Sequence, residues 1–144
     1  MDEASRHTIE ALGALARASE RLIELARLVS ARPDATAVVQ RVDLRYFEGS
    51  GPYLAMYVDA ELNSGDAICW WLEVDWDEQQ WTIETRILIN RATERYQDEL
   101  HRFPDRVADT LAGLGAALDA AVRDLMQAAD EPRPEHATPP ALST

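Results

Sequence analysis

The stretch that decides the fold is residues 53–89, YLAMYVDAELNSGDAICWWLEVDWDEQQWTIETRILI. Apolar and polar residues alternate in three segments of it. The apolar positions are Leu54, Met56, Val58, Ala60 and Leu62; Ile68, Trp70, Leu72, Val74 and Trp76; and Trp81, Ile83, Thr85, Ile87 and Ile89. Because a period of two places every second side chain on one face, these segments predict three β-strands that share one apolar face.

Short turns separate these strands. Asn63-Ser64-Gly65 lies between the first two and Asp77-Glu78-Gln79-Gln80 between the next two. The same alternation precedes them at Val42, Leu44 and Tyr46, before a turn signal at 48–52. Short turns require antiparallel neighbours, so four consecutive strands form a meander. Residues 91–103 fit either a fifth, polar edge strand centred on 99–101 or a loop.

Helical periodicity flanks the strands on both sides. Residues 2–31 predict one long helix that ends before Pro33, and its apolar stripe is Leu12, Leu15, Leu22, Ala26 and Val29, broadened by Ile9, Ile23, Leu25 and Leu28. A second helix is expected beyond Pro104, with Asp105 as its N-cap. Its apolar stripe is Val107, Leu111, Leu114, Leu118, Val122 and Leu125.

The two helices are the only material available to cover the apolar face of the sheet. The predicted fold class is therefore α+β: a two-layer sandwich with a long N-terminal helix, a four- or five-stranded antiparallel meander and a C-terminal helix, both helices on one face. Residues 1–130 are expected to form a single domain. Residues 131–144 are rich in proline and lack an apolar face, so they are expected to be a disordered tail.

The composition narrows the class of partner. The 144 residues carry 26 acidic and 14 basic side chains, a formal net charge of −12, and every basic residue is arginine. Phosphate would be repelled by such a surface, so no nucleic acid is expected as a partner. No apolar run approaches the ~20 residues of a membrane span and no signal peptide is evident, so we expect no membrane contact and a cytoplasmic protein. Whether the chain is a monomer or a homodimer is left open.

The sequence contains no recognisable catalytic or metal-binding motif. His7, His101 and His136 do not share the spacing of metal ligands, and Cys69 lies on a strand without a partner that would activate it. The alternating acids of residues 73–77 lack the glycine turn and carbonyl ligands of a calcium loop. We therefore expect no catalytic residues, no metal and no cofactor.

The face of the sheet that points away from the helices is the candidate binding surface. Turn lengths pair Tyr57 with Trp71 and Trp71 with Arg86, and they place Asp43 beside Tyr57. The predicted site is this row of four residues with an acidic rim that includes Glu73, Asp75 and Glu84. Such a row either stabilises the sheet through cross-strand contacts or forms an interface, because Tyr, Trp and Arg are enriched at binding hot spots.

In size, acidity and layout the chain resembles two classes of small bacterial protein. Immunity proteins are acidic α+β domains that neutralise basic toxins, and secretion chaperones are acidic α+β proteins that bind an effector. The predicted function is a non-catalytic module that binds a basic protein, as an immunity protein does. The alternatives are a secretion-chaperone-like protein, disfavoured because no helix interrupts the strands, and a protein that binds a small molecule in a pocket between helices and sheet.

Overall fold

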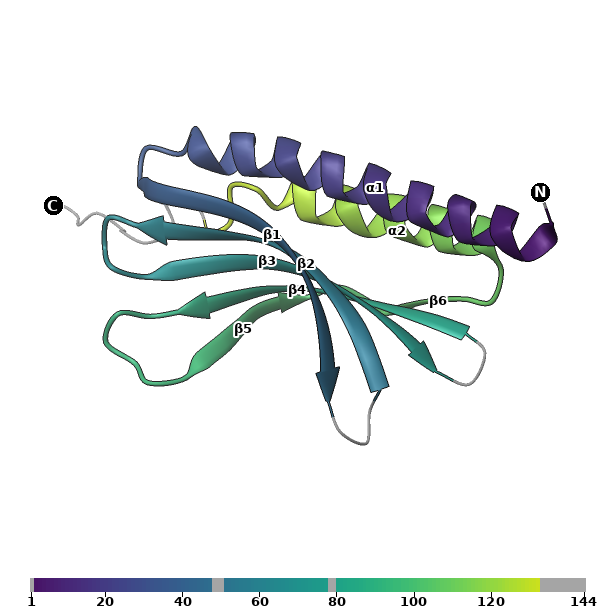
Figure 1. Ribbon diagram of the computed structural model, residues 1–144. Helices are drawn as coiled ribbons and strands as arrows, with labels where there is room; N and C mark the ends of the chain where they lie inside the picture. Colours follow the sequence, from purple (N-terminus) through teal and green to yellow (C-terminus); the bar gives the residue numbers. More distant parts are fainter. Residues whose placement is uncertain (1, 48–50, 78–79, 133–144) are drawn as a thin grey trace, which may run out of the picture.

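The computed structural model describes residues 2–47, 51–77 and 80–132. It has the predicted α+β architecture, with a helix at each end of the described chain and an antiparallel sheet between them (Figure 1). The elements are α1 (Glu3–Ser30), β1 (Ala35–Phe47), β2 (Gly51–Leu62), β3 (Ala67–Asp77), β4 (Gln80–Asn90), β5 (Gln97–Arg102), β6 (Arg106–Ala108) and α2 (Leu111–Gln127). Both helices lie on the same face of the sheet, as predicted.

The strand order is that of a meander, β1-β2-β3-β4-β5, with β6 paired to β4. The predicted pairs of Tyr57 with Trp71 and of Trp71 with Arg86 are confirmed. In the hairpin between β2 and β3, the Leu62 amide donates to the Asp66 carbonyl over 2.9 Å, and Gly65 has a φ of 92°. A positive φ suits glycine because it has no Cβ, so the sequence signal for this turn has a direct physical cause.

One predicted pairing is wrong. The residue opposite Tyr57 on β1 is Arg41, while Asp43 lies opposite Ala55. The composition of residues 48–52 predicts a turn over all five, whereas the ladder continues through the pairs Phe47–Gly51 and Tyr46–Pro52. A turn that is shorter by two residues moves every partner on β1 by two positions and keeps the same face, because the side-chain period of a strand is two.

The main core lies between the helices and the sheet. Trp70, Met56, Leu72, Ile83 and Ile87 on the strands are fully buried against both helices. The indole Nε1 of Trp70 donates to the Ala128 carbonyl just after α2 over 2.9 Å, so the largest core side chain also satisfies its polar atom.

The buried stripe of α1 differs from the predicted one. It consists of Ala14, Ala18, Leu22, Leu25 and Val29, whereas Leu12 is 61% exposed. Leu22, Leu25 and Val29 are buried as predicted, whereas in the first half of the helix Ala14 and Ala18, rather than Leu12, point toward the core. Because alanine is small, α1 can approach the rest of the core closely at these positions.

The structure of the segment between β4 and α2 decides between strand and loop for residues 91–103, and it corrects the predicted N-cap of the second helix. Residues 97–102 form an edge strand, β5, and residues 106–108 pair with β4 as β6. The second helix begins only at Leu111, with Thr110 as its N-cap: the Thr110 hydroxyl accepts from the Gly113 amide over 3.0 Å. Asp105 is therefore not the cap. Val107 is 58% exposed on β6 and not part of a helical stripe.

Two residues of the predicted tail are described and contact the domain. The Arg32 guanidinium donates to the carbonyls of Glu131, over 2.8 Å, and of Pro132, over 3.0 Å. The remainder of that prediction, residues 133–144, lies outside the described residues. Among the described helices, none combines the length and the apolar composition that crossing a membrane requires.

Candidate functional site: the outer face of the sheet

The outer face is the surface of the sheet that turns its side chains away from the helices. One row of cross-strand neighbours crosses it from edge to edge: Arg41, Tyr57, Trp71, Arg86 and Arg102. We call this the central row. The sequence analysis identified its three middle members but not Arg41, which the wrong β1 register displaced, or Arg102, which lies in the segment left open.

The middle of the central row is an aromatic stack. The rings of Tyr57 and Trp71 lie 5.0 Å apart with an angle of 24° between their planes. Tyr57 is only 7% exposed, and it belongs to a small second core with Ala55, Cys69 and Leu88. The expectation of a single apolar face is therefore corrected: the outer face also buries side chains. Part of the stacking energy stabilises the sheet itself.

A network of hydrogen bonds covers the stack on the β1 side. The Tyr57 hydroxyl donates to Asp43 Oδ2 over 2.7 Å, and Arg45 binds the same carboxylate oxygen over 3.1 Å. The Arg45 guanidinium lies 5.4 Å from the centre of the Trp71 ring. The hydrogen bonds from Tyr57 and Arg45 hold the pKa of Asp43 below its ordinary value. Asp43 thus reaches Tyr57 diagonally although it is not directly opposite.

The carboxylates of Glu73, Asp75 and Glu84 gather on the other side of Trp71. Their oxygens lie within 4.8 Å of one another, and we call these three residues the carboxylate cluster. Glu73 and Glu84 are directly opposite each other on β3 and β4. Like charges in such a pair destabilise a sheet.

Burial is the main cause that raises the pKa of both glutamates, and neighbouring carboxylates raise it further: Asp75 for Glu73, and Glu73 for Glu84. Nearby arginines partly offset this rise in pKa, because their positive charge favours the ionised carboxylates. Arg86 lies 3.6 Å from Glu73 and Arg102 lies 3.3 Å from Glu84. The Trp71 indole also donates to Glu73 over 3.1 Å. The cluster is therefore negative, partly desolvated and in contact with the aromatic stack.

A shallow hollow of about 330 Å³ lies beside the stack. Arg45, Tyr57, Asp59, Cys69, Trp71 and Arg86 contribute to its walls. Burial raises the pKa of the Cys69 thiol far above its ordinary value, so the thiolate needed for nucleophilic attack is suppressed. The grouped carboxylates and the stacked rings of this face can contact a ligand through charge and aromatic surface.

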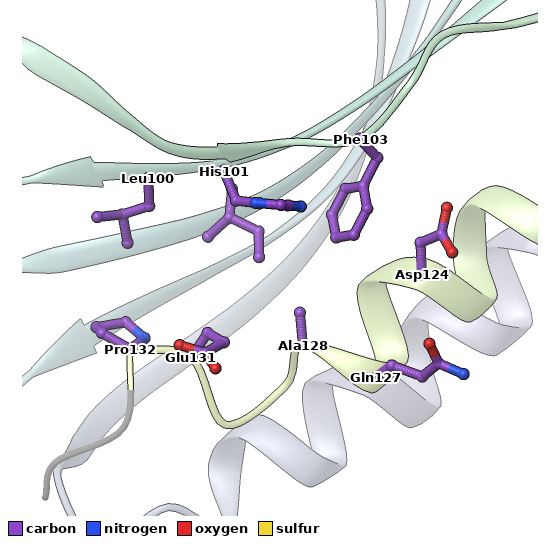
Figure 2. A pocket seen from close by; sticks show the side chains of 9 residues that line it. Leu100, His101, Phe103, Asp124, Gln127, Ala128, Glu131 and Pro132 are labelled. Carbon is purple, nitrogen blue, oxygen red and sulfur yellow. The ribbon is translucent and has the colours of Figure 1, made fainter. Parts of the chain in front are cut away.

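A second hollow, of about 470 Å³, lies on the helix side of the sheet, where β4 and β5 face the end of α2. Figure 2 shows Leu100, His101 and Phe103 above Ala128, with Asp124 and Glu131 at the sides. The His101 and Phe103 rings meet edge to face at 4.4 Å. A pocket between helices and sheet is the alternative considered from the sequence, and one wall of this hollow comes from β5, in the segment for which strand and loop were both open.

Comparison of the chain with protein-family models, with curated proteins and with solved structures found no match.

Proposed function

We propose that this protein is a non-catalytic binding module that takes a basic protein partner on the outer face of its sheet. The observation that carries the proposal is the carboxylate cluster of Glu73, Asp75 and Glu84, packed within 4.8 Å beside Trp71. A guanidinium or ammonium group of a partner would be attracted by all three carboxylates at once.

Crowding of like charges in the free protein favours the binding of a cation. Opposed glutamates on adjacent strands repel each other, and burial weakens their hydration. A bound cation reduces the repulsion between the carboxylates and replaces part of their lost hydration. Part of the binding free energy therefore comes from electrostatic repulsion that is already present in the free protein. The net charge of −12 would also steer a basic partner toward the molecule and raise the association rate.

The class of partner follows from this chemistry. Neutralisation of a basic toxin by an immunity protein needs an acidic, pre-formed surface and no catalytic group. The outer face is pre-formed, because the central row is stacked and hydrogen-bonded before any partner arrives. A gene for a basic toxin next to this gene would support the proposal.

A peptide titration tests the site directly. We would add hexa-arginine to ¹⁵N-labelled protein and follow the Trp71 indole N–H signal, with hexa-glutamate as the control ligand. The double variant Glu73→Gln, Glu84→Gln should bind hexa-arginine at least tenfold more weakly, because hydrogen bonds to charged groups are worth ~1.5–3 kcal/mol each.

The matched control removes the same charge elsewhere. Glu10→Gln, Glu24→Gln lies on exposed positions of α1 and should change the dissociation constant less than twofold. The wild-type affinity should also fall with added salt and with falling pH, since protonated carboxyl groups attract no cation. Equal weakening in both double variants would refute the outer face as the site.

The hollow beside α2 favours a second candidate function, the binding of a small apolar molecule. Its walls combine Ile87, Leu100 and Phe103 with the polar groups of His101 and Gln127, which is the usual composition of a ligand pocket. Native mass spectrometry of the purified protein would detect a retained ligand. Leu100→Trp, which fills the hollow, should remove that ligand while the Glu73→Gln, Glu84→Gln variant keeps it.

A further inference from the structure

The two edges of the sheet differ in their protection against strand pairing. β5, at one edge, is six residues long, has the sequence QDELHR and is irregular in register. Those features block the addition of another strand. β1, at the opposite edge, has 13 residues and no proline, and its Val42 and Leu44 are 48% and 78% exposed. β1 has its own irregularity in register, between Ala35 and Ala37, but its pairing is regular from residue 37 to residue 47. A long, regular edge strand is a template for pairing.

A flank of α1 without charged residues lies above the same edge. α1 packs over β1 and β2, with α2 on its other side, where Arg21 lies 3.9 Å from Asp119. Leu12 precedes Arg21 by nine residues, which is about two and a half helical turns. The Leu12 side chain therefore lies on the opposite side of α1 from Arg21 and faces away from α2. The residues of this uncharged flank are Thr8, Leu12, Ser19, Ile23, Ala26 and Ser30.

α1 approaches β1 through Leu15, which lies one helical turn from Leu12 and Ser19 of the uncharged flank. Leu15 of α1 and Leu44 of β1 line the same hollow of about 200 Å³, which also contacts Trp76. Leu12 and Ile23 on the helix are 61% and 41% exposed, and Val42 and Leu44 on the strand point to the same side of the sheet as the helices. Contiguous exposed apolar surface of this kind marks an interaction site.

We propose that this surface binds a second copy of the chain, with the two β1 strands antiparallel about a two-fold axis at Val42. The two sheets would then join into one, and the uncharged flanks of the two α1 helices would face each other across the axis (Figure 1 shows β1 and α1 at this edge). A two-fold interface requires a surface that is complementary to itself, and the charges on β1 decide the register that achieves this.

A register with one β1 residue on the axis keeps both helix layers on one side. An axis at Leu44 pairs Asp43 with Arg45 of the second copy but overlaps only residues 41–47 of each strand, whereas an axis at Val42 overlaps residues 37–47. Two further registers lie near the middle of β1. An axis at Arg41 sets that arginine against itself, and an axis at Asp43 sets that aspartate against itself. An axis at Val42 pairs each Arg41 with Asp43 of the second copy and brings the two Val42 side chains together on the helix side. Opposite charges directly across a strand pair stabilise it, whereas like charges destabilise it.

Charge and size also favour a second copy as the occupant. Two chains that each carry −12 repel each other over most of their surfaces, but the described charges of β1 are Arg41, Asp43 and Arg45, and the α1 flank has none. With 28 residues in α1, the surface is about 40 Å long; helix and sheet layers together are about 20 Å high. The product is on the order of 800 Å² per copy, the size of a standard stable interface.

The first experiment measures the mass in solution. Sedimentation velocity at roughly 5–200 µM should give a species near twice the 16.1 kDa of the chain. Val42→Lys sets two ammonium groups against each other at the axis and should weaken association at least tenfold. The control Val107→Lys, at a residue 58% exposed on β6, should leave association unchanged. Circular dichroism and thermal melting would show that both variants remain folded.

The second experiment tests the register. Arg41→Asp and Asp43→Arg should each weaken the dimer, and the double variant should restore it. Val42→Cys should form a disulfide-linked dimer with oxidised glutathione, while Val107→Cys should not; the native Cys69 is buried. A monomer at every concentration overturns the proposal, even if β1 then binds an extended peptide. A dimer that tolerates Val42→Lys overturns it equally. Neither result depends on the carboxylate cluster, so the proposed function is tested separately.

Discussion

Trp70 and Trp71 show how a single position on a strand decides the environment of a side chain. Trp70 is fully buried beneath both helices, whereas Trp71 is partly exposed on the outer face and stacks on Tyr57. Successive residues of a strand point to opposite faces, so two identical side chains next to each other have different structural tasks.

Truncation of these two tryptophans should have unequal effects. Trp70→Ala should cost roughly 3–5 kcal/mol of unfolding free energy, because it leaves a cavity in the main core. Trp71→Ala loses one partner of an aromatic pair and should cost about 1–2 kcal/mol. Urea denaturation measures both values. Equal costs would mean that the outer face is buried as deeply as the core.

The carboxyl groups of the outer face have opposing effects on stability. The pKa of Glu73 and of Glu84 lies above the ordinary value of 4.5, mainly through burial. The folded state therefore binds more protons than the unfolded state between pH 4.5 and the raised values. Stability that depends on these two groups falls as the pH rises through that window. Asp43 has a lowered pKa and behaves in the opposite way, since its contribution is lost only as the pH falls below its ordinary value of 3.8.

Unfolding measured at several pH values should show the direction of this effect on stability. As the pH falls from 7 toward about 4.5, protonation of Glu73 and Glu84 should add to the free energy of unfolding. Glu73→Gln should remove part of this gain, and at pH 7 it should be at least as stable as the wild type, because the amide carries no charge to repel Glu84. Urea denaturation at four pH values compares the two proteins. A steeper pH dependence in the variant would show that the raised pKa values have another cause.

At the scale of elements, the alternation of apolar and polar residues predicts the buried face of a strand better than helical periodicity predicts the buried face of a helix. The strand faces on β2, β3 and β4 follow the predicted parity without exception, because a period of two has only two possible phases. The periodicity predicts the extent of the long helix and the burial of Leu22, Leu25 and Val29, but it favours Leu12 where Ala14 and Ala18 are buried. A helix with apolar residues on several sides has no unique buried face until its neighbours are known.

The C-terminal boundary offers a prediction at the same scale. Arg32 is nearly buried and ties the end of α1 to the backbone after α2, through the carbonyls of Glu131 and Pro132. A chain that stops after Pro132 should melt within ~1 °C of full length, as unanchored termini usually allow. Arg32→Met should lower the melting temperature by roughly 3–8 °C, because it leaves Asp34 and these carbonyls without their donor. A large loss on truncation would show that residues 133–144 contribute to folding.

At the scale of the whole molecule, the main core joins both ends of the described chain. It contains Leu22 of α1, Trp70 of β3 and Leu118 of α2 in one cluster. Neither helix can therefore leave without exposing the face of the sheet that both cover. We therefore expect the fold to unfold as a single cooperative unit.

Cooperativity should appear as one unfolding transition. Far-ultraviolet circular dichroism reports mainly on the helices, and tryptophan fluorescence reports on β3 and β4, which hold all four tryptophans. The two signals should give the same urea midpoint within error, and Leu118→Ala should move both by the same amount. Two separate midpoints would show that the helix layer unfolds apart from the sheet.

The amino-acid pattern alone predicts the class of fold, the strand faces, most of the ladder and the presence of aromatic and acidic residues on one face. Those properties depend on periodicity and on short turns, which are local. Three features are visible only in the tertiary structure: Arg41 lies opposite Tyr57, the Arg45 guanidinium lies over Trp71, and the carboxylates of Glu73, Asp75 and Glu84 converge. These properties depend on exact turn length and on contacts between distant segments, for which a local pattern has no physical signal.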